Sequence, residues 1–355
     1  MKVFAILHEP ASYTEDRNLK VYDSIGIQYV YMYKGSYAST GNVEGEISVL
    51  PKNLVRLVNR LLKILLENDA IIINGYSNKV FILLFLLNIF YRKPIGIDSD
   101  TQLSIPSDPI KRLLKWIYLR VVFTSTCVYG LAGGNGSHKE LFRHYGLSED
   151  HIFLMPMMVD NSKFYNKSTR ISNAFTFLYV GRIVDCKNLV TLLNAFVERF
   201  VGRDDVILDV VGDGPLLSAY KQSFSEYKNI VFSGKCVADS LVEKYHSADV
   251  FILPSAYEPW GLVVNEAMSA GLPVIVSDQV GAAYDLVEGK DTGFVFKWND
   301  VQDLQRKMLA IYEDRDLCKR FSMNASKLMH EHWNYDLYRE CLTNFLDYAA
   351  NKRVG

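Results

Sequence analysis

The sequence contains no apolar run long enough to cross a lipid bilayer as a helix. Its most apolar stretch, residues 80–91, is about twelve residues long, whereas a spanning helix needs roughly 20. The N-terminal apolar run, residues 3–7, ends at His8 and Glu9 and is too short for the core of a signal peptide. We therefore expect a buried strand at residues 2–7 and a buried helix at 78–91, with a re-entrant membrane segment as the alternative for 80–91.

Cysteine is sparse, and no sign of charge dominates. The five cysteines, at positions 127, 186, 236, 318 and 341, are odd in number and form no C-x-x-C pair, which favours a reduced, cytoplasmic compartment. The 39 basic residues nearly balance the 40 acidic ones, so the composition argues against a nucleic-acid partner. Residues 1–165 are slightly basic, with 18 Lys and Arg against 15 Asp and Glu. That excess is compatible with contact with an anionic membrane surface or with a phosphate-bearing acceptor.

Strands and helices alternate along the chain, which predicts an α/β fold with parallel sheets. Its 355 residues, of which 49% are apolar, favour two domains. We expect strands near residues 2–7, 27–33, 69–74, 94–97, 126–131, 151–155, 175–180, 206–211, 230–233, 249–253, 273–277 and 293–296. Helices are expected near 51–66, 78–91, 108–122, 137–145, 315–331 and 335–350, with Ser137 and Glu140 as a capping box.

A polar, aperiodic stretch at residues 161–173 marks the predicted boundary between the domains. The expected N-terminal domain covers residues 1–165 and is joined by the C-terminal helix, about 336–355. The expected C-terminal domain covers residues 174–335. No internal repeat or low-complexity tract divides the chain further.

Two glutamates eight positions apart, Glu258 and Glu266, flank a predicted strand-to-helix turn. Open α/β sheets bind ligands at the carboxyl ends of their strands, and the free N–H groups at a helix start suit a phosphate. The N–H groups of Gly261, Leu262 and Val263 are expected to lie there. The two carboxylates would accept hydrogen bonds from neutral hydroxyls on either side. A pair of solvated surface glutamates is the alternative.

The segment 258–266, with residues 267–275 after it, resembles the donor-site signature of the GT-B glycosyltransferases, specifically the large retaining family 4. Further matches follow in the family's order at residues 179–182 with Lys187, at 210–215 and at 232–234. The resemblance covers about residues 125–340 and is specific in the second half. It implies two Rossmann-like, doubly wound parallel-sheet domains facing across a cleft, with the last helix returning to the first domain around 333–338.

The resemblance assigns Arg182 and Lys187 to the donor diphosphate, Glu258 to sugar hydroxyls and Glu266 to the ribose. Arg182, Lys187 and Glu258 are the expected catalytic residues, because stabilising the departing phosphates lowers the barrier. No enzymic nucleophile is expected. Further donor-binding candidates are Gly181, Gly212, Gly214, Lys235, Cys236, Pro259, Trp260, Gly261, Leu262 and Val263. The turns at 212–214 and 234–236 are equally compatible with ordinary strand ends.

The first domain departs from the family pattern, since Asp98 and Asp100 stand where the family often has a histidine. They are candidates for the acceptor cleft, and their D-x-D spacing leaves a divalent metal site as the less favoured alternative. His8, Tyr13 and residues 133–136 are acceptor-side candidates by position. Residues 111–120 interleave cations with bulky apolar groups, which fits either a membrane surface or a core-packed helix.

These features predict a retaining glycosyltransferase that needs no metal or other cofactor. It would move a hexosyl group from a UDP-sugar or GDP-sugar to a glycan or lipid-linked acceptor, in the biosynthesis of a surface polysaccharide such as capsule, O-antigen or exopolysaccharide. The expected location is cytoplasmic, at the inner face of the membrane if the basic segment binds lipid. A nucleotide-sugar epimerase, a glycan phosphorylase and an inactive nucleotide-sugar-binding module are the alternatives.

Overall fold

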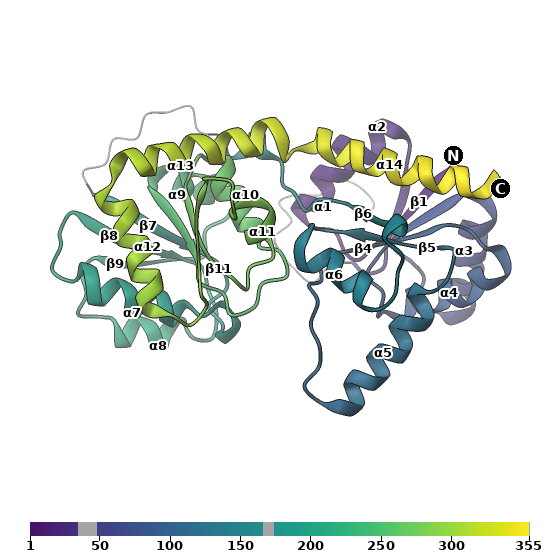
Figure 1. Cartoon of the computed structure of the whole chain (residues 1–355), viewed down its shortest axis with the longest axis horizontal. Helices are drawn as coiled ribbons and strands as arrows, with labels where there is room; N and C mark the ends of the chain where they lie inside the picture. The colour runs from purple at the N-terminus through teal and green to yellow at the C-terminus, as the bar shows by residue number, and fades with distance from the viewer. Residues whose placement is uncertain (35–47, 166–173, 355) are drawn as a thin grey trace. The chain divides into compact units, whose positions relative to one another are not determined.

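The computed structural model describes residues 1–34, 48–165 and 174–354 (Figure 1). The chain forms two compact units, with Met1–Met157 and Tyr335–Gly355 in unit 1 and Met158–Asn334 in unit 2. The polar stretch predicted as the boundary therefore begins inside unit 2, and its residues 166–173 lie outside the described part of the chain. No helix among the described residues combines the length and apolarity that a bilayer span requires.

Unit 1 is built on a parallel sheet whose six described strands run in the order β2-β1-β3-β4-β5-β6. These strands are β1 (Val3–Leu7), β2 (Gln28–Tyr31), β3 (Ala70–Asn74), β4 (Ile95–Ser99), β5 (Val128–Ala132) and β6 (Ile152–Leu154). The helices are α1 (Ser12–Arg17), η1 (Asn18–Tyr22), α2 (Asp23–Ile25), α3 (Leu54–Glu67), α4 (Lys79–Tyr91), α5 (Pro109–Phe123), α6 (Gly136–His144), η2 (Glu149–His151) and α14 (Tyr335–Val354).

Unit 2 has a second parallel sheet, with six described strands in the order β12-β11-β10-β7-β8-β9. They are β7 (Phe175–Val180), β8 (Val206–Val211), β9 (Ile230–Gly234), β10 (Val250–Leu253), β11 (Val274–Ser277) and β12 (Gly293–Phe296). The helices are η3 (Asn161–Lys163), η4 (Asp185–Lys187), α7 (Leu189–Phe200), α8 (Leu217–Ser223), α9 (Asp239–Ser247), α10 (Leu262–Ser269), α11 (Ala282–Leu286), α12 (Val301–Glu313), α13 (Arg315–Lys327) and η5 (Leu328–His332).

The strands are short apolar runs because both faces of each sheet are covered by helices. All five residues of β1 and of β5 are buried, as are all four of β10 and of β11. Every predicted strand is present, with ends within two residues of the expected ones. The helix expected at 78–91 is α4, but only one side of it is buried: Phe81 and Leu84 lie in the core of unit 1, whereas Phe90 is 86% exposed.

Three local expectations differ from the structure. The sequence predicts no helix between residues 7 and 27, whereas α1, η1 and α2 occupy Ser12–Ile25. These are pieces of six, five and three residues, and no side chain caps α1, so the usual start signal is missing. The predicted capping box at Ser137 is wrong, because α6 begins at Gly136 and the Ser137 hydroxyl accepts the Leu103 N–H at 3.0 Å. Strand β4 also continues through Asp98 to Ser99, beyond its expected end at 97.

The C-terminal helix α14 belongs to unit 1, as the family resemblance implied. Its Tyr338 hydroxyl lies 3.3 Å from the Tyr22 hydroxyl of η1, and both rings are buried. Further along, Phe345 packs edge-on against Tyr129 of β5 at 5.6 Å between ring centroids. In Figure 1, α14 runs with α1 and α2 along one face of the unit 1 sheet, opposite the face that carries α3, α4 and α5. Unit 1 therefore includes both ends of the chain.

In each unit the direction of the connections reverses in the middle of the sheet. In unit 1, the chain leaves β1 toward β2 on one side, while β3 leads toward β4 on the other. In unit 2, β7 leads toward β8 on one side, while the neighbouring β10 leads toward β11 on the other. Right-handed crossovers then place the helices that follow the two central strands on opposite faces. This leaves an opening at the strands' carboxyl ends, where such folds bind ligands.

The turn after β8 depends on the absence of a side chain at Gly212. This residue has φ +147°, and a Cβ there would lie 1.9 Å from the Gly181 carbonyl oxygen. Gly202 also has positive φ, +75°, but a Cβ there would meet nothing within 4 Å.

We therefore expect Gly212→Ala to destabilise unit 2 by more than Gly202→Ala does. The Gly202 change should cost only the backbone term of about 1–2 kcal/mol, whereas the Gly212 change must also move the 181 peptide. Urea unfolding followed by tryptophan fluorescence measures the difference, because Trp260 and Trp333 are buried in unit 2. Equal costs for the two variants would contradict this account.

Candidate functional site

Backbone hydrogen bonds join the loops that follow β7, β8 and β9 at the carboxyl edge of the unit 2 sheet. The Gly181 N–H donates to the Val211 carbonyl at 3.0 Å, and the Ile183 N–H donates to the Asp213 carbonyl at 2.8 Å. On the next strand, the Gly212 N–H donates to Gly234 at 2.8 Å. The predicted glycines therefore lie side by side at this edge. Gly214, with φ +159°, is needed because a Cβ there would lie 2.3 Å from the Ile183 carbonyl oxygen.

The loop that carries Glu258 is held from both sides of the central strand β10. The Ala256 N–H donates to the Cys186 carbonyl of η4 at 2.9 Å. On the other side, the Glu258 N–H donates to Gln279 at 3.1 Å, and its carbonyl accepts the Gly281 N–H at 3.0 Å. The loops after β7, β10 and β11 therefore form one connected surface at the point where the crossover direction reverses.

Lys187 and Glu258 meet on this surface as an ion pair. The Lys187 ammonium donates to a Glu258 carboxylate oxygen. The two side chains are only 14% and 11% exposed, respectively. Predicted from different segments of the sequence, the two residues are thus brought together by the fold. Their charges offset each other in this state, so neither is simply a free charge awaiting a ligand.

The start of α10 provides N–H groups without a side-chain cap. Gly261 is the N-cap, with φ +97°, and has no side chain with which to cap the first turn. The N–H groups of Leu262 and Val263 point out of the helix start, as geometry requires. Next to them, the Trp260 indole N–H donates to Asn265 at 2.7 Å, and its buried ring stacks on Trp333 at 5.6 Å. The Trp260 ring thus anchors the turn between Pro259 and Gly261.

Glu266 lies one turn further along α10 and is held by a buried tyrosine. The Tyr245 hydroxyl donates to a Glu266 oxygen at 2.7 Å. Burial raises the pKa of Glu266 to about 7, and the Tyr245 hydrogen bond partly offsets that rise. This carboxyl group therefore changes charge close to neutral pH.

The remaining donor-side candidates are more exposed. Arg182 follows β7 with its side chain exposed, and its carbonyl accepts the Tyr179 hydroxyl at 2.9 Å. Lys235 is exposed and Cys236 half-buried after β9. All three therefore stand at the same sheet edge as Lys187, but the described structure pairs none of them with a carboxylate.

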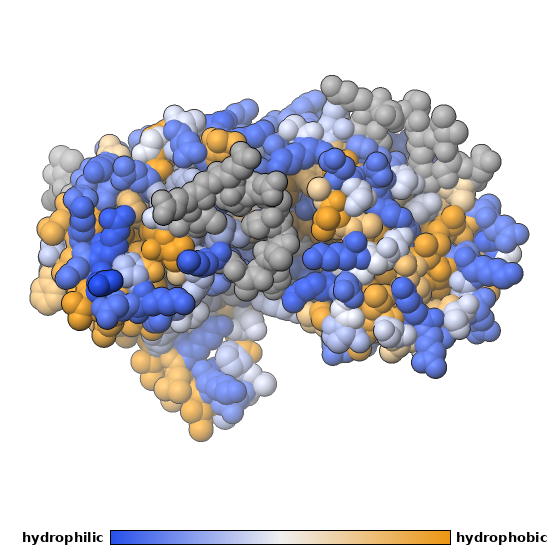
Figure 2. All heavy atoms as spheres, turned by 180° about the vertical axis from the view of Figure 1, so that it is seen from behind, coloured by the Kyte–Doolittle hydropathy of each residue, from blue (hydrophilic) through white to orange (hydrophobic). Residues whose placement is uncertain are grey.

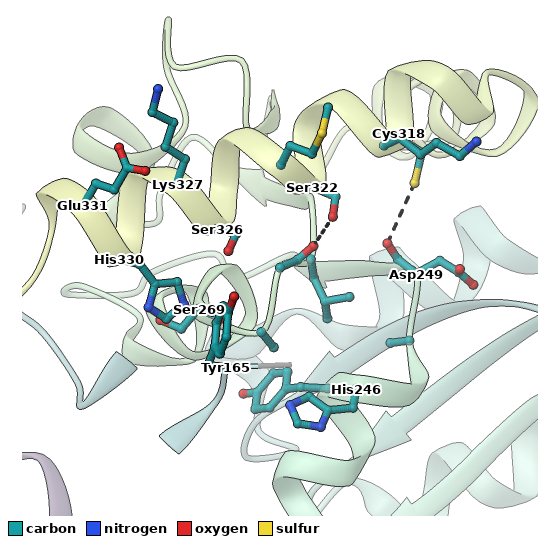
Figure 3. Close-up of a pocket in the computed structure, with 17 residues that line it drawn as sticks. Tyr165, His246, Asp249, Ser269, Cys318, Ser322, Ser326, Lys327, His330 and Glu331 are labelled. Carbon is teal, nitrogen blue, oxygen red and sulfur yellow. Dashed lines mark hydrogen bonds between the residues drawn. The ribbon is translucent and has the colours of Figure 1, made fainter. Parts of the chain in front are cut away.

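A separate pocket of 660 Å³ in unit 2 contains none of the predicted residues (Figure 3). It lies between the end of α9, the end of α10 and the helix pair α13 and η5, with His246, Ser269, Cys318 and His330 among its lining residues. Two lining hydroxyl and thiol groups already bond the backbone, Ser322 to Gly271 and Cys318 to Asp249. This pocket is not at the carboxyl edge of the sheet and is not part of the candidate donor site.

Unit 1 has its own hollow, of 560 Å³, where the direction of its crossovers reverses. The structure brings four predicted acceptor-side residues together there, His8, Tyr13, Asp98 and Asp100. Residues 133–136 do not line it. Gly133 instead supports its wall, since its N–H donates to the Ser99 carbonyl at 2.9 Å.

Two residues that the sequence did not indicate complete the unit 1 pocket. The guanidinium of Arg17 lies 3.4 Å from the Asp98 carboxylate, which also accepts from Asn74 at 2.8 Å. Burial raises the pKa of Asp98 to about 6, while Arg17 lowers it. Burial also raises the pKa of Asp100. Asn74 ends β3 and could have been found from the reversal of the crossovers. Arg17 gave no signal, because it lies on the unexpected helix α1.

The D-x-D pattern does not assemble a metal cage in the described residues. No group of three or more His, Cys, Asp or Glu side chains there is arranged to hold a metal ion. The Arg17 guanidinium, which contacts Asp98, would also repel a divalent cation at that carboxylate.

These two Rossmann-like units, each a doubly wound parallel sheet, define the fold as GT-B. Crystallised Anabaena Alr3699/HepE, in complex with UDP, has the same fold. It superposes with a TM-score of 0.81 over 98% of this chain and 100% of that one, at 17% identity. At that identity, the likeness establishes the fold alone.

The sequence comparisons identify the family of the second unit. Residues 160–328 match the family model described as glycosyl transferases group 1, and the chain therefore carries a domain of that family. The sulfoquinovosyl transferase SQD2 of Arabidopsis thaliana is 37% identical over 143 residues, which is 39% of this chain and 27% of that protein.

A second relative is aligned over much more of the chain. The Escherichia coli UDP-Gal:alpha-D-GlcNAc-diphosphoundecaprenol alpha-1,3-galactosyltransferase is 25% identical over 76% of this chain and 73% of its own length. Alignments with several other curated relatives span only 41% to 46% of those proteins.

The Lys187–Glu258 pair should be energetically coupled. We expect Lys187→Met and Glu258→Gln each to destabilise unit 2, and the double variant to cost less than the sum by about 1–3 kcal/mol. The exposed pair Lys319–Asp316, 77% and 97% exposed, is the matched control and should couple by less than about 0.5 kcal/mol. Double-mutant cycles from urea unfolding measure both coupling energies. Equal coupling energies in the two pairs would contradict the expectation that Lys187 and Glu258 interact more strongly than the exposed pair.

Glu266 should make the stability of unit 2 depend on pH. Its pKa is about 7 in the folded state against 4.5 for the free side chain, so the folded state binds more protons between these values. The free energy of unfolding therefore falls as pH rises from about 5 to 8. Glu266→Gln should reduce this fall by on the order of 1–3 kcal/mol. Urea unfolding at about pH 5 and about pH 8 measures this fall in the wild type and in Glu266→Gln, and Glu243→Gln, a change at an exposed glutamate, is the control. A fall unchanged in Glu266→Gln would disprove it.

Proposed function

We propose that the chain is a retaining glycosyltransferase that moves a hexosyl group from a UDP-sugar or GDP-sugar to a glycan or lipid-linked acceptor. The carrying observation is the convergence of Lys187, Glu258 and the open start of α10 at the reversal point of the unit 2 sheet. Family membership of this unit supports transfer, and the UDP complex of Alr3699/HepE supports a nucleotide donor.

The chemistry explains why these groups belong together. As the bond between the anomeric carbon and the phosphate oxygen breaks, negative charge grows on the departing diphosphate. Arg182, Lys187 and the N–H groups of Leu262 and Val263 supply positive charge and hydrogen-bond donors for it, each worth roughly 3–4 kcal/mol when well placed. Glu258, released from Lys187, accepts hydrogen bonds from the sugar hydroxyls. Glu266 accepts from the ribose, and Lys235 and Cys236 lie beside the base.

The acceptor is assigned to the 560 Å³ pocket of unit 1. Its carboxylates Asp98 and Asp100, with Asn74 and Tyr13, suit a neutral, hydroxyl-bearing molecule such as a sugar. In a retaining transfer without an enzymic nucleophile, the acceptor oxygen bonds to the anomeric carbon on the face that the phosphate leaves. Its proton passes to the departing phosphate oxygen. The cations of unit 2 replace a metal in this scheme.

A role in surface polysaccharide biosynthesis, at the cytoplasmic side of a membrane, completes the proposal. The Escherichia coli relative acts on a diphosphoundecaprenol-linked sugar, as its name states, and aligns with three quarters of this chain. A capsular polysaccharide biosynthesis glycosyltransferase of Staphylococcus aureus is also similar, at 27% identity over 59% of the chain.

The test is release of nucleoside diphosphate from a panel of UDP-hexoses and GDP-hexoses, with and without acceptor. Arg182→Ala and Glu258→Ala should each lower kcat/KM by about 100-fold or more, because each removes a transition-state contact. Arg306→Ala, an equally drastic change on a 62% exposed arginine of α12, should leave the rate unchanged. A chelator should have no effect.

Wild-type turnover retained in both site variants would refute the site assignment. Nucleotide binding without turnover of any donor would instead identify an inactive nucleotide-sugar-binding module.

A further inference from the structure

Helix α5 of unit 1 presents an apolar stripe to the outside. Its residues are Ile110, Leu113, Leu114, Ile117 and Val121, whose exposed fractions range from 47% to 69%. The spacing i, i+3, i+4, i+7 and i+11 places them on one side of the helix. The opposite side supplies the core of unit 1 with Leu119, Val122 and Phe123, each at most 2% exposed.

Helix α4 adds a second outward stripe. Ile82, Leu86, Ile89 and Phe90 are 42%, 52%, 57% and 86% exposed, again at spacings that share one side of a helix. Helices α4 and α5 follow the adjacent strands β3 and β4 in the same direction, so right-handed crossovers place them on the same face of the sheet. We call the exposed residues of these two helices the α4–α5 face.

Cations outnumber carboxylates around this face, although Asp108 at the start of α5 is an exposed carboxylate. Seven cations lie on or next to the two helices, and residues 70–97 and 109–139 contain no Asp or Glu. The chain as a whole carries a net charge of −1, so this concentration is local. Figure 2 shows hydrophobic and hydrophilic surface side by side on the part of unit 1 that projects downward, which Figure 1 identifies as α5. The seven cations are Lys79, Arg92, Lys93, Lys111, Arg112, Lys115 and Arg120.

We propose that the α4–α5 face docks unit 1 on an anionic lipid bilayer. Apolar side chains at a helix surface enter the boundary between headgroups and acyl chains, and flanking Lys and Arg attract anionic headgroups. Trp116, 45% exposed on α5, is the residue type that favours that boundary. This proposal goes beyond the proposed function and does not require it.

A second copy of the chain is a poorer occupant of the same face. In a two-fold dimer the same patch meets itself. Seven cations would then face seven cations, and Asp108 at the start of α5 would offset only one of them on each copy. A layer of anionic headgroups supplies the missing negative charge together with an apolar phase.

Sedimentation of the full chain with vesicles tests the proposal. Wild type should pellet with vesicles of phosphatidylcholine mixed with phosphatidylglycerol, and should bind phosphatidylcholine alone more weakly. Leu113→Ser/Leu114→Ser should lower the partition coefficient on the mixed vesicles by about tenfold or more, because both side chains leave the apolar phase. Lys111→Glu/Arg112→Glu should weaken binding on the mixed vesicles and lose most of its salt dependence.

Matched variants in unit 2 distinguish a specific effect of the α4–α5 face from the general effect of removing exposed apolar or basic side chains. Val201→Ser/Met323→Ser changes side chains that are 55% and 66% exposed, and should bind vesicles like wild type. Arg306→Glu/Lys319→Glu is the charge control, on side chains 62% and 77% exposed. Thermal unfolding of each variant, with and without UDP or GDP, shows that it is folded. A wild type that binds neither UDP nor GDP but pellets with vesicles would count against the proposed function only.

Three outcomes overturn the proposal. The first is a wild type that stays in the supernatant with anionic vesicles. The second is equal pelleting of wild type and Leu113→Ser/Leu114→Ser. The third is a wild-type dimer in sedimentation velocity that this variant dissociates while vesicle binding is unchanged. Fluorescence adds an independent readout, because bromolipids should quench Trp116 emission in wild type and have less effect on Trp116→Phe.

Discussion

The reversal of crossover direction in the middle of each parallel sheet is the constraint on which the rest of the molecule depends. Because the connections are right-handed, the helices that follow the two central strands lie on opposite faces of the sheet. The carboxyl ends of these two strands therefore stay uncovered. In unit 2 this edge gathers the loops of Lys187 and Glu258, which are 71 residues apart in sequence. In unit 1 it gathers His8, Asn74 and Asp98 around one pocket. Side chains from distant segments thus meet because of topology, before any specific contact forms.

Backbone hydrogen bonds then fix what topology brings together. The Glu258 loop is tied to η4 on one side and to the loop after β11 on the other. Stacked Trp260 and Trp333 anchor its end, and the close approach of loops at Gly212 and Gly214 leaves no room for side chains. The Glu258 loop therefore loses little conformational entropy when a ligand binds. The close approach of the loops is a structural reason for glycine at both positions, 212 and 214.

Most of the fold was predictable because buried parallel strands are short apolar runs, as at β1 and β10. The segment Ser12–Ile25 was not, since three short helical pieces without a side-chain cap leave no periodic signal. That gap concealed Arg17, whose place beside Asp98 follows only from tertiary packing. On the donor side, the residues could be named from the resemblance. Their pairing could not, because an ion pair such as Lys187–Glu258 depends on the register of two loops.

The mutual neutralisation of Lys187 and Glu258 has a consequence for selectivity. Any small anion that attracts the ammonium leaves a poorly solvated carboxylate behind, and that loss offsets the gain. A molecule that carries both a phosphate and a hydroxyl-rich ring satisfies both partners at once. On the proposed function, the Glu258 carboxylate competes with anionic ligands for the Lys187 ammonium. The enzyme without ligand therefore binds the intact nucleotide-sugar in preference to free phosphate or the nucleoside diphosphate product.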